Sequence, residues 1–95
     1  MPITISLKVL PGGLADKMAT YAAVDRAIEV IQQSGLKHLV GPSETTIEGE
    51  YDQVMAVIKQ AQEATLAVAP HVFTLIGIDW NPTGSSIDEK LEKYR

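Results

Sequence analysis

Apolar residues occupy every second position across residues 3–9, with polar residues between them. A period of two predicts a strand with one apolar and one polar face, which ends at the Pro-Gly-Gly of residues 11–13. A helix is predicted next, with Asp16 as its N-cap and Gly35 as a left-handed C-cap. Its expected core-facing stripe, spaced by three and four residues, is Tyr21, Val24, Ala27, Ile28 and Ile31.

Two short strands are predicted over residues 37–41 and 45–50, and Pro42 and Ser43 between them indicate a hairpin. Asp52 is expected to cap a second helix, which Pro70 closes. The apolar stripe of this helix is predicted to comprise Val54, Val57, Ile58, Ala61, Ala64, Thr65 and Val68. Residues 72–80 form a last strand that is apolar on both faces, a pattern typical of a strand buried on both faces.

A short terminal helix is predicted over residues 86–94, because Ser86 and Glu89 match a capping box. The order β-α-β-β-α-β predicts an α+β, ferredoxin-like sandwich. We expect a four-stranded antiparallel sheet with two helices on one face, plus the short C-terminal helix, in a single domain of residues 1–95. The other sheet face would be open, so a second subunit is expected to cover it in a homodimer or homotetramer.

Composition narrows the possible functions. The chain has 95 residues, is 45% hydrophobic and 21% charged, and contains no cysteine. It therefore cannot form a disulfide or a thiolate metal site. A net charge of −4 argues against nucleic-acid binding. We recognise no signal peptide and no apolar run long enough to span a bilayer, so a cytoplasmic protein without membrane contact is expected.

The segment of residues 41–52 carries four carboxylates and no lysine or arginine. Glu44, Thr46 and Glu48 alternate along one strand, so they share a face. One interpretation is a solvated edge whose charges prevent aggregation, and the other is a site for a cationic or amino-bearing small molecule. The residues alone favour the first. Trp80 is similarly open to two interpretations, as the rim of a pocket or as part of a subunit interface.

The same segment carries a family resemblance. Residues 41–50 read Gly-Pro-Ser-Glu-Thr-Thr-Ile-Glu-Gly-Glu and are followed by Asp52-x-Val54-Met55. This stretch resembles the signature of the small YkoF-related thiamine-binding proteins, and the similarity extends over residues 3–79. The resemblance implies a ferredoxin-like fold, assembly into dimers or tetramers, and binding of thiamine or its hydroxymethylpyrimidine part. It implies neither catalysis nor a cofactor.

The six candidate ligand contacts are Ser6, Glu44, Thr45, Thr46, Glu48 and Trp80. The positions that match the family signature are Glu44, Thr45, Thr46 and Glu48. A carboxylate such as Glu44 could pair with the aminopyrimidine edge of thiamine or attract its cationic ring, and Ser6 could add a hydroxyl hydrogen bond beside Thr46. Trp80 or Tyr51 could stack on the pyrimidine. No catalytic or metal-binding residue is predicted.

The sequence thus predicts a non-catalytic binder of thiamine or hydroxymethylpyrimidine that acts as a carrier, buffer or sensor. Two alternatives stay open at this point. One is a small cofactor-free enzyme with a reaction chamber at the subunit interface. The other is a protein-interaction or regulatory module that uses the open sheet face.

Overall fold

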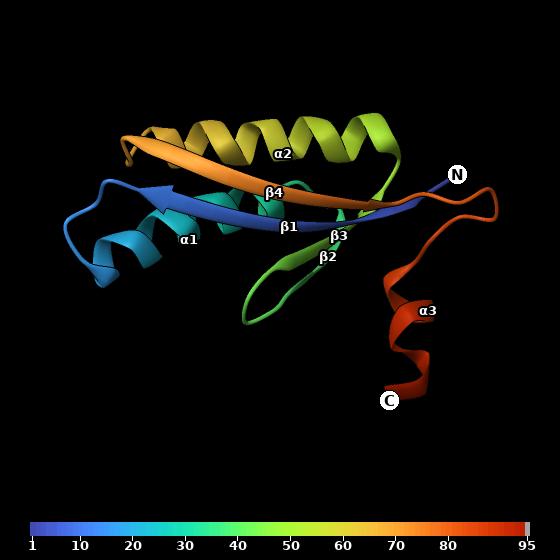
Figure 1. The fold of residues 1–95 in the computed structure, drawn as a ribbon. Helices are drawn as coiled ribbons and strands as arrows, with labels where there is room; N and C mark the ends of the chain where they lie inside the picture. The colour runs from blue at the N-terminus through green and yellow to red at the C-terminus, as the bar shows by residue number, and fades with distance from the viewer. Residues whose placement is uncertain (95) are drawn as a thin grey trace.

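The fold is a single antiparallel sheet with strand order β2-β3-β1-β4, backed by two helices (Figure 1). The computed structural model describes residues 1–94. The elements are β1 (Ile3–Gly12), α1 (Lys17–Gln33), β2 (Lys37–Val40), β3 (Thr45–Gly49), α2 (Tyr51–Leu66), β4 (His71–Asp79), α3 (Ile87–Leu91) and the 3-10 turn η1 (Glu92–Tyr94). The predicted ferredoxin-like α+β architecture with a short C-terminal helix is confirmed.

The register of β1 divides the sheet into two faces. Ile5 lies opposite Ile47 of β3 and Ile78 of β4, on the side covered by α1 and α2. Ser6 lies opposite Thr46 and Gly77, on the side that the two long helices leave open. We call this second side the open face. The predicted alternation along residues 3–9 is therefore confirmed.

The core lies between the helix side of the sheet and the two long helices. Burial of an isoleucine side chain stabilises a fold by about 1.5–3 kcal/mol relative to exposure, so a compact aliphatic cluster suffices to hold the layers together. The buried cluster is Ile3, Ile5, Leu7, Ile31, Ile47, Val54, Val57 and Ile58.

The predicted ends of α1 are confirmed, but one predicted core residue is wrong. The Asp16 carboxylate accepts a hydrogen bond from the backbone N–H of Ala19 at 2.8 Å, and Gly35 has a φ of +78°. Tyr21, however, is 58% exposed. The buried face of α1 runs through Ala23, Ala27 and Ile31, and a residue two positions before Ala23 points nearly the opposite way around the helix.

The start of α2 also differs from the prediction. The helix begins at Tyr51, and Glu50 occupies the N-cap position without a side-chain capping bond. Asp52 therefore lies in the first turn, where its charge favours the helix N-terminus without capping it. At the other end the helix stops at Leu66, so Val68 lies beyond it and is 48% exposed instead of continuing the stripe.

Strand β1 continues past its predicted end, through Pro11 to Gly12. Proline is tolerated there because β3 stops pairing with β1 at Leu7, and beyond that point β1 has only β4 beside it.

The prediction that the last strand is buried on both faces is wrong for the single chain. Strand β4 is an edge strand of the sheet, and Phe73 and Leu75 on its open face are 58% and 49% exposed.

Candidate functional site

A hollow on the open face is the candidate site. It has a volume of about 370 Å³ and lies over β1, β3 and β4, with one wall from α3. Small-molecule pockets in proteins occupy about 300–1,000 Å³, so the hollow lies at the lower end of that range. We call it the open-face hollow, and its lining residues are Thr4, Ile5, Ser6, Glu44, Thr46, Gly77, Ile78, Asp79 and Lys90.

A tight turn before β3 positions the acidic side of the hollow. The backbone N–H of Gly41 donates to the carbonyl oxygen of Glu44 at 2.9 Å, which closes the β2–β3 connection. A Cβ atom at residue 41 would lie only 2.8 Å from that carbonyl oxygen, so the close approach requires glycine. The turn places Glu44 at the start of β3, on the same face as Thr46. Ser6 on β1 is the cross-strand partner of Thr46, so both hydroxyl groups face the hollow.

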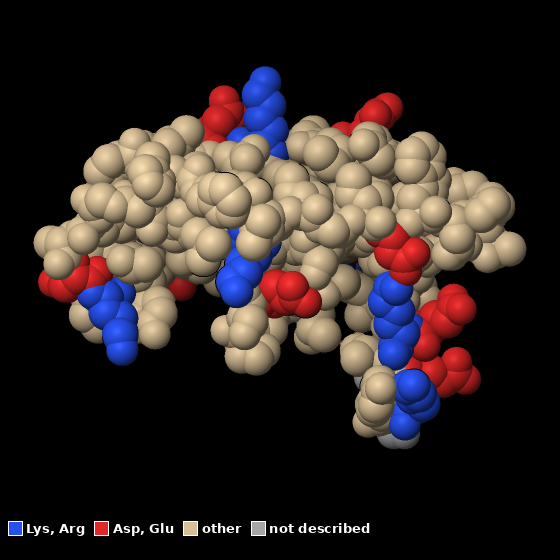
Figure 2. Space-filling model, viewed as in Figure 1, with Lys and Arg blue, Asp and Glu red and all other residues tan. Residues whose placement is uncertain are grey.

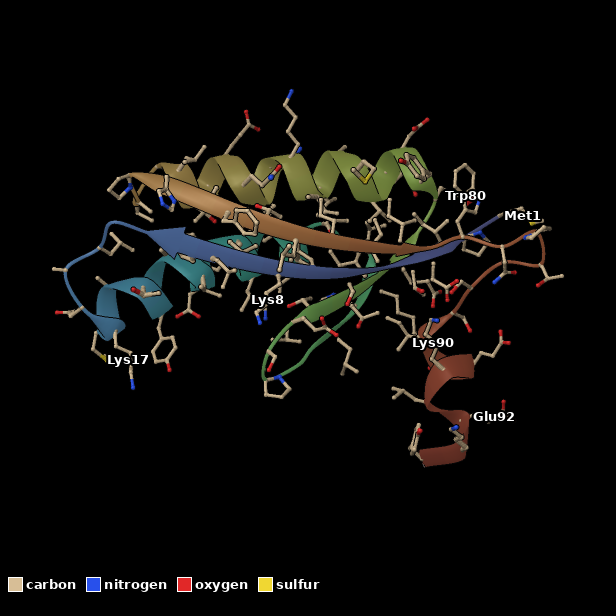
Figure 3. All side chains as sticks on the ribbon, viewed as in Figure 1. Met1, Lys8, Lys17, Trp80, Lys90 and Glu92 are labelled. Carbon is tan, nitrogen blue, oxygen red and sulfur yellow. The ribbon has the colours of Figure 1, made fainter. Side chains whose placement is uncertain are left out.

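The opposite side of the hollow depends on the docking of the C-terminal segment. The hydroxyl groups of Thr4 and Ser85 share a buried hydrogen bond of 2.7 Å, and the Ser85 hydroxyl also donates to Asp79 Oδ2 at 3.2 Å. The Lys90 ammonium forms an ion pair with the same Asp79 oxygen. Lys90 points from α3 toward the strands in Figure 3.

The pKa of Asp79 is lowered below its usual range by these contacts. The largest cause is the hydrogen bond from Lys90, with further contributions from the Lys90 charge and the Ser85 hydroxyl. Asp79 therefore stays ionised at neutral pH. With Glu44 it gives the hollow two carboxylates against one ammonium group, so the lining carries a net negative charge of one. This balance favours a ligand with a single positive charge.

Three of the six predicted contact residues line the hollow together: Ser6, Glu44 and Thr46. The other three are placed elsewhere. Thr45 is 6% exposed and faces the helix side, because neighbouring residues on a strand point to opposite faces. It lines a separate hollow of only about 90 Å³, near the β2–β3 turn.

Glu48 and Trp80 already have partners within the chain. The Glu48 carboxylate accepts the backbone N–H of Ile87 at 2.8 Å, so it holds the start of α3. Trp80 packs against Tyr51 with ring centroids 5.0 Å apart. Figure 3 shows Trp80 on the α2 side of the β4 end, away from α3. Neither side chain lines the open-face hollow.

The sequence prediction missed six hollow-lining residues: Thr4, Ile5, Gly77, Ile78, Asp79 and Lys90. Thr4 and Gly77 belong to the same alternating pattern as Ser6, and could have been found by extending the open face to β4. Asp79 and Lys90 could not, because their positions depend on the β1–β4 register and on where α3 docks.

Within residues 1–94, no cluster of three or more histidine, aspartate or glutamate side chains is placed to hold a metal ion. None of the helices in that part of the chain combines the length and apolar character needed to cross a membrane. Charged side chains in Figure 2 gather on and around α3, and a blue and a red group lie side by side below the middle of the view, whereas the surface over β4 is largely uncharged.

Comparisons with known proteins agree with this fold. A UPF0045 protein of Clostridium perfringens is 38% identical over 92 residues, which cover 96% of this chain and 95% of the relative. A solved domain of unknown function from Bacillus cereus is 46% identical with a TM-score of 0.90, over 99% of this chain and 90% of that one. A solved Thermotoga maritima protein, provisionally named for thiamine biosynthesis or salvage, is 36% identical with a TM-score of 0.91 over the full length of both chains.

The chain folds as a ferredoxin-like domain, and the high TM-scores show that these solved relatives share that fold. The sequence profile of the thiamine-binding protein family matches residues 5–95. The chain therefore belongs to the thiamine-binding protein family, and the resemblance inferred from residues 41–55 is confirmed.

Proposed function

We propose that the protein binds thiamine or its hydroxymethylpyrimidine part in the open-face hollow, without catalysing a reaction. The observation that carries this proposal is the convergence of Ser6, Thr46 and Glu44 on one hollow of small-molecule size. Membership of a family named for thiamine binding supports it, as does the provisional thiamine-related name of the Thermotoga relative.

The chemistry of thiamine fits this lining. The exocyclic amine of its pyrimidine can donate a hydrogen bond to the Glu44 carboxylate. The pyrimidine ring nitrogens can accept hydrogen bonds from the hydroxyl groups of Ser6 and Thr46. The thiazolium ring carries one fixed positive charge, which matches the net negative charge of the hollow. A diphosphate group would add negative charge, so we expect thiamine diphosphate to bind more weakly than thiamine.

The state of Asp79 fits the binding of a cation. The hydrogen bond from Lys90 lowers the pKa of this carboxyl, so it is negatively charged beside the hollow. We further propose that the protein acts as a carrier, buffer or sensor of the vitamin. Its cytoplasmic location and the absence of a cofactor stay predictions from the sequence.

The test is a set of paired substitutions read by calorimetric titration with thiamine. A hydrogen bond to a charged group contributes about 1.5–3 kcal/mol, and each 1.4 kcal/mol is about tenfold in affinity. Glu44→Gln should therefore raise the dissociation constant for thiamine by about tenfold to a hundredfold, and Thr46→Val should raise it by a smaller factor. The matched controls are Glu63→Gln on α2 and Thr45→Val, whose side chain faces the helices.

Both controls should bind thiamine as the natural chain does. Unchanged affinity in Glu44→Gln and Thr46→Val together would show that the ligand does not bind in the open-face hollow. A loss in Thr45→Val equal to that in Thr46→Val would point to the hollow near the β2–β3 turn instead.

A further inference from the structure

Lys90 occupies an unusual place for a surface lysine. Among the described residues that line the open-face hollow, it alone carries a positive charge. Its ammonium group pairs with Asp79 Oδ2, and the two side chains are 46% and 48% exposed. An ion pair this exposed adds little to the stability of a fold. Its position in the lining therefore points to an effect on what the hollow binds.

The ion pair between Asp79 and Lys90 lies where two hollows meet. A second hollow of about 180 Å³ lies beside α3, and Asp79 and Lys90 are the two residues that line both hollows. Glu89 also lines the second hollow. The flexible stem of a lysine lets its ammonium group take several positions. Rotation of Lys90 into the second hollow would free Asp79 toward the open-face hollow and bring the ammonium group near the Glu89 carboxylate.

The docking of α3 has other contacts besides this ion pair. Ile87 is 4% exposed, and its backbone N–H donates to the Glu48 carboxylate at 2.8 Å. The hydroxyl groups of Thr4 and Ser85 share their buried hydrogen bond just before the helix. Because none of these contacts includes Lys90, its side chain can move while the backbone of α3 stays in place.

The two carboxylates of the open-face hollow have different surroundings. Glu44 lies with the hydroxyl groups of Ser6 and Thr46, on the side formed by β1 and β3. Asp79 lies at the end of β4, on the side that α3 closes. Thiamine has a hydrogen-bonding aminopyrimidine at one end and a cationic ring at the other. The hydroxyl-rich side suits the aminopyrimidine, which leaves Asp79 as the carboxylate for the cationic ring.

We propose that Lys90 sets the charge selectivity of the open-face hollow, as the resident cation of Asp79 that the cationic ring of thiamine displaces. The inference rests on the proposed function. An uncharged ligand can bind without disturbing the ion pair between Asp79 and Lys90. A cationic ligand reaches Asp79 only by replacing Lys90, so the ion pair that it breaks offsets part of its attraction to the carboxylate. Lys90 therefore narrows the preference of the hollow for thiamine over its uncharged pyrimidine part.

Calorimetric titration with two ligands tests the selectivity, with thiamine as the cation and hydroxymethylpyrimidine, above neutral pH, as the uncharged ligand. The measured quantity is the ratio of the two dissociation constants. Lys90→Met should shift this ratio in favour of thiamine by about twofold to fivefold, the range expected for a half-exposed charge pair. The shift should vanish in about 1 M salt, where charges are screened within about 3 Å. A change in the shape of the hollow alone would not depend on salt in this way.

Lys93→Met is the matched control, because it removes the same charge from the same end of the chain. The Lys93 ammonium group lies 5.2 Å from the centroid of the Tyr94 ring, and Lys93 does not line the open-face hollow. Lys93→Met should therefore keep the natural ratio. Lys90→Arg should also keep it, because the positive charge remains. An equal ratio in Lys90→Met and the natural chain, or an equal shift in Lys93→Met, would overturn the proposal.

Acetylation of lysine side chains by an N-hydroxysuccinimide ester tests the displacement itself. A nearby carboxylate favours the charged form of an amine, which does not react. Saturation with thiamine should therefore increase the labelling of Lys90 relative to Lys93 of the same chain, as read by mass spectrometry, and hydroxymethylpyrimidine should not. Unchanged or slower labelling of Lys90 with thiamine bound would show that the ion pair stays closed, and would overturn the displacement.

These outcomes separate the inference from the proposed function. If the natural chain binds both ligands and the ratio does not respond to Lys90→Met, the inference fails and the proposed function stands. If the natural chain and Lys90→Met bind neither ligand, the proposed function fails and the inference fails with it.

Discussion

Asp79 is the residue on which the C-terminal segment and the sheet converge. Its carboxylate accepts from Ser85 and pairs with Lys90, and the same carboxylate lines the open-face hollow. Lys90 therefore links α3 to the end of β4 and offsets one of the two negative charges that line the hollow. Its ion pair is about half exposed, so its stabilising effect is expected to be small and sensitive to salt.

Removal of the Lys90 charge should raise the pKa of Asp79. We expect the side-chain carboxyl carbon of Asp79 in Lys90→Met to titrate at a higher pH than in the natural chain, when followed by NMR. Lys59→Met, on α2, is the control and should leave the titration unchanged. The same midpoint in Lys90→Met and the natural chain would mean that Lys90 does not stabilise the ionised carboxylate.

The lowered pKa also sets the direction of the pH dependence. An aspartate whose pKa is lower in the folded chain stabilises the fold above its unfolded value of about 3.9. That contribution is lost as the pH falls through the folded value. The natural chain should therefore lose stability more steeply than Lys90→Met when both are acidified below about pH 4.

At the same scale, period-two alternation explains which site residues could be predicted. Alternation from residues 3–9 and 44–48 placed Ser6, Glu44 and Thr46 on one face, and the structure brings these three together. The same alternation turns Thr45 toward the helices. Glu48 shares the face of Thr46, but its carboxylate accepts a hydrogen bond from the backbone N–H of Ile87. That contact depends on where α3 docks, so no local sequence pattern predicts it.

Helix α3 is the element whose position depends most on tertiary contacts. An isolated helix of five residues does not form in water, so α3 relies on its cap and its docking. Ser86 accepts from the N–H of Glu89 at 3.1 Å, as the capping pattern predicted. Ile87 is 4% exposed, and its backbone N–H is held by Glu48. The local signal predicted that the helix exists, but nothing in the sequence predicted which part of the sheet it contacts.

Ile87→Ala should loosen α3 selectively. Loss of the buried side chain weakens docking, so amide hydrogen exchange in residues 85–91 should become faster while the amides of β1 keep their protection. Tyr94→Ala is the control, because Tyr94 is 73% exposed. Exchange of α3 amides at the natural rate in Ile87→Ala would show that the helix is held without this contact.

At the scale of the whole molecule, the order of elements was predictable and the environment of the last strand was not. The spacing of apolar residues in strands and in helices is a local property, so it predicted the ferredoxin-like order of strands and helices. Apolar residues on both faces of β4 suggested burial, but the strand lies at an edge and stays exposed in the single chain. The apolar pattern of a strand is local, whereas its burial depends on which elements lie beside it, so the sequence alone did not predict that β4 is an edge strand.

Titration calorimetry of the natural chain is the first test of whether the open-face hollow binds thiamine or its pyrimidine part. Thiamine and hydroxymethylpyrimidine should each give saturable heat at one ligand per chain, and thiamine diphosphate should bind more weakly. At 100 times the dissociation constant, ligand should stabilise the fold by about 2.7 kcal/mol and raise the melting temperature. No saturable heat and no melting shift with thiamine or the pyrimidine would contradict the proposed binding function.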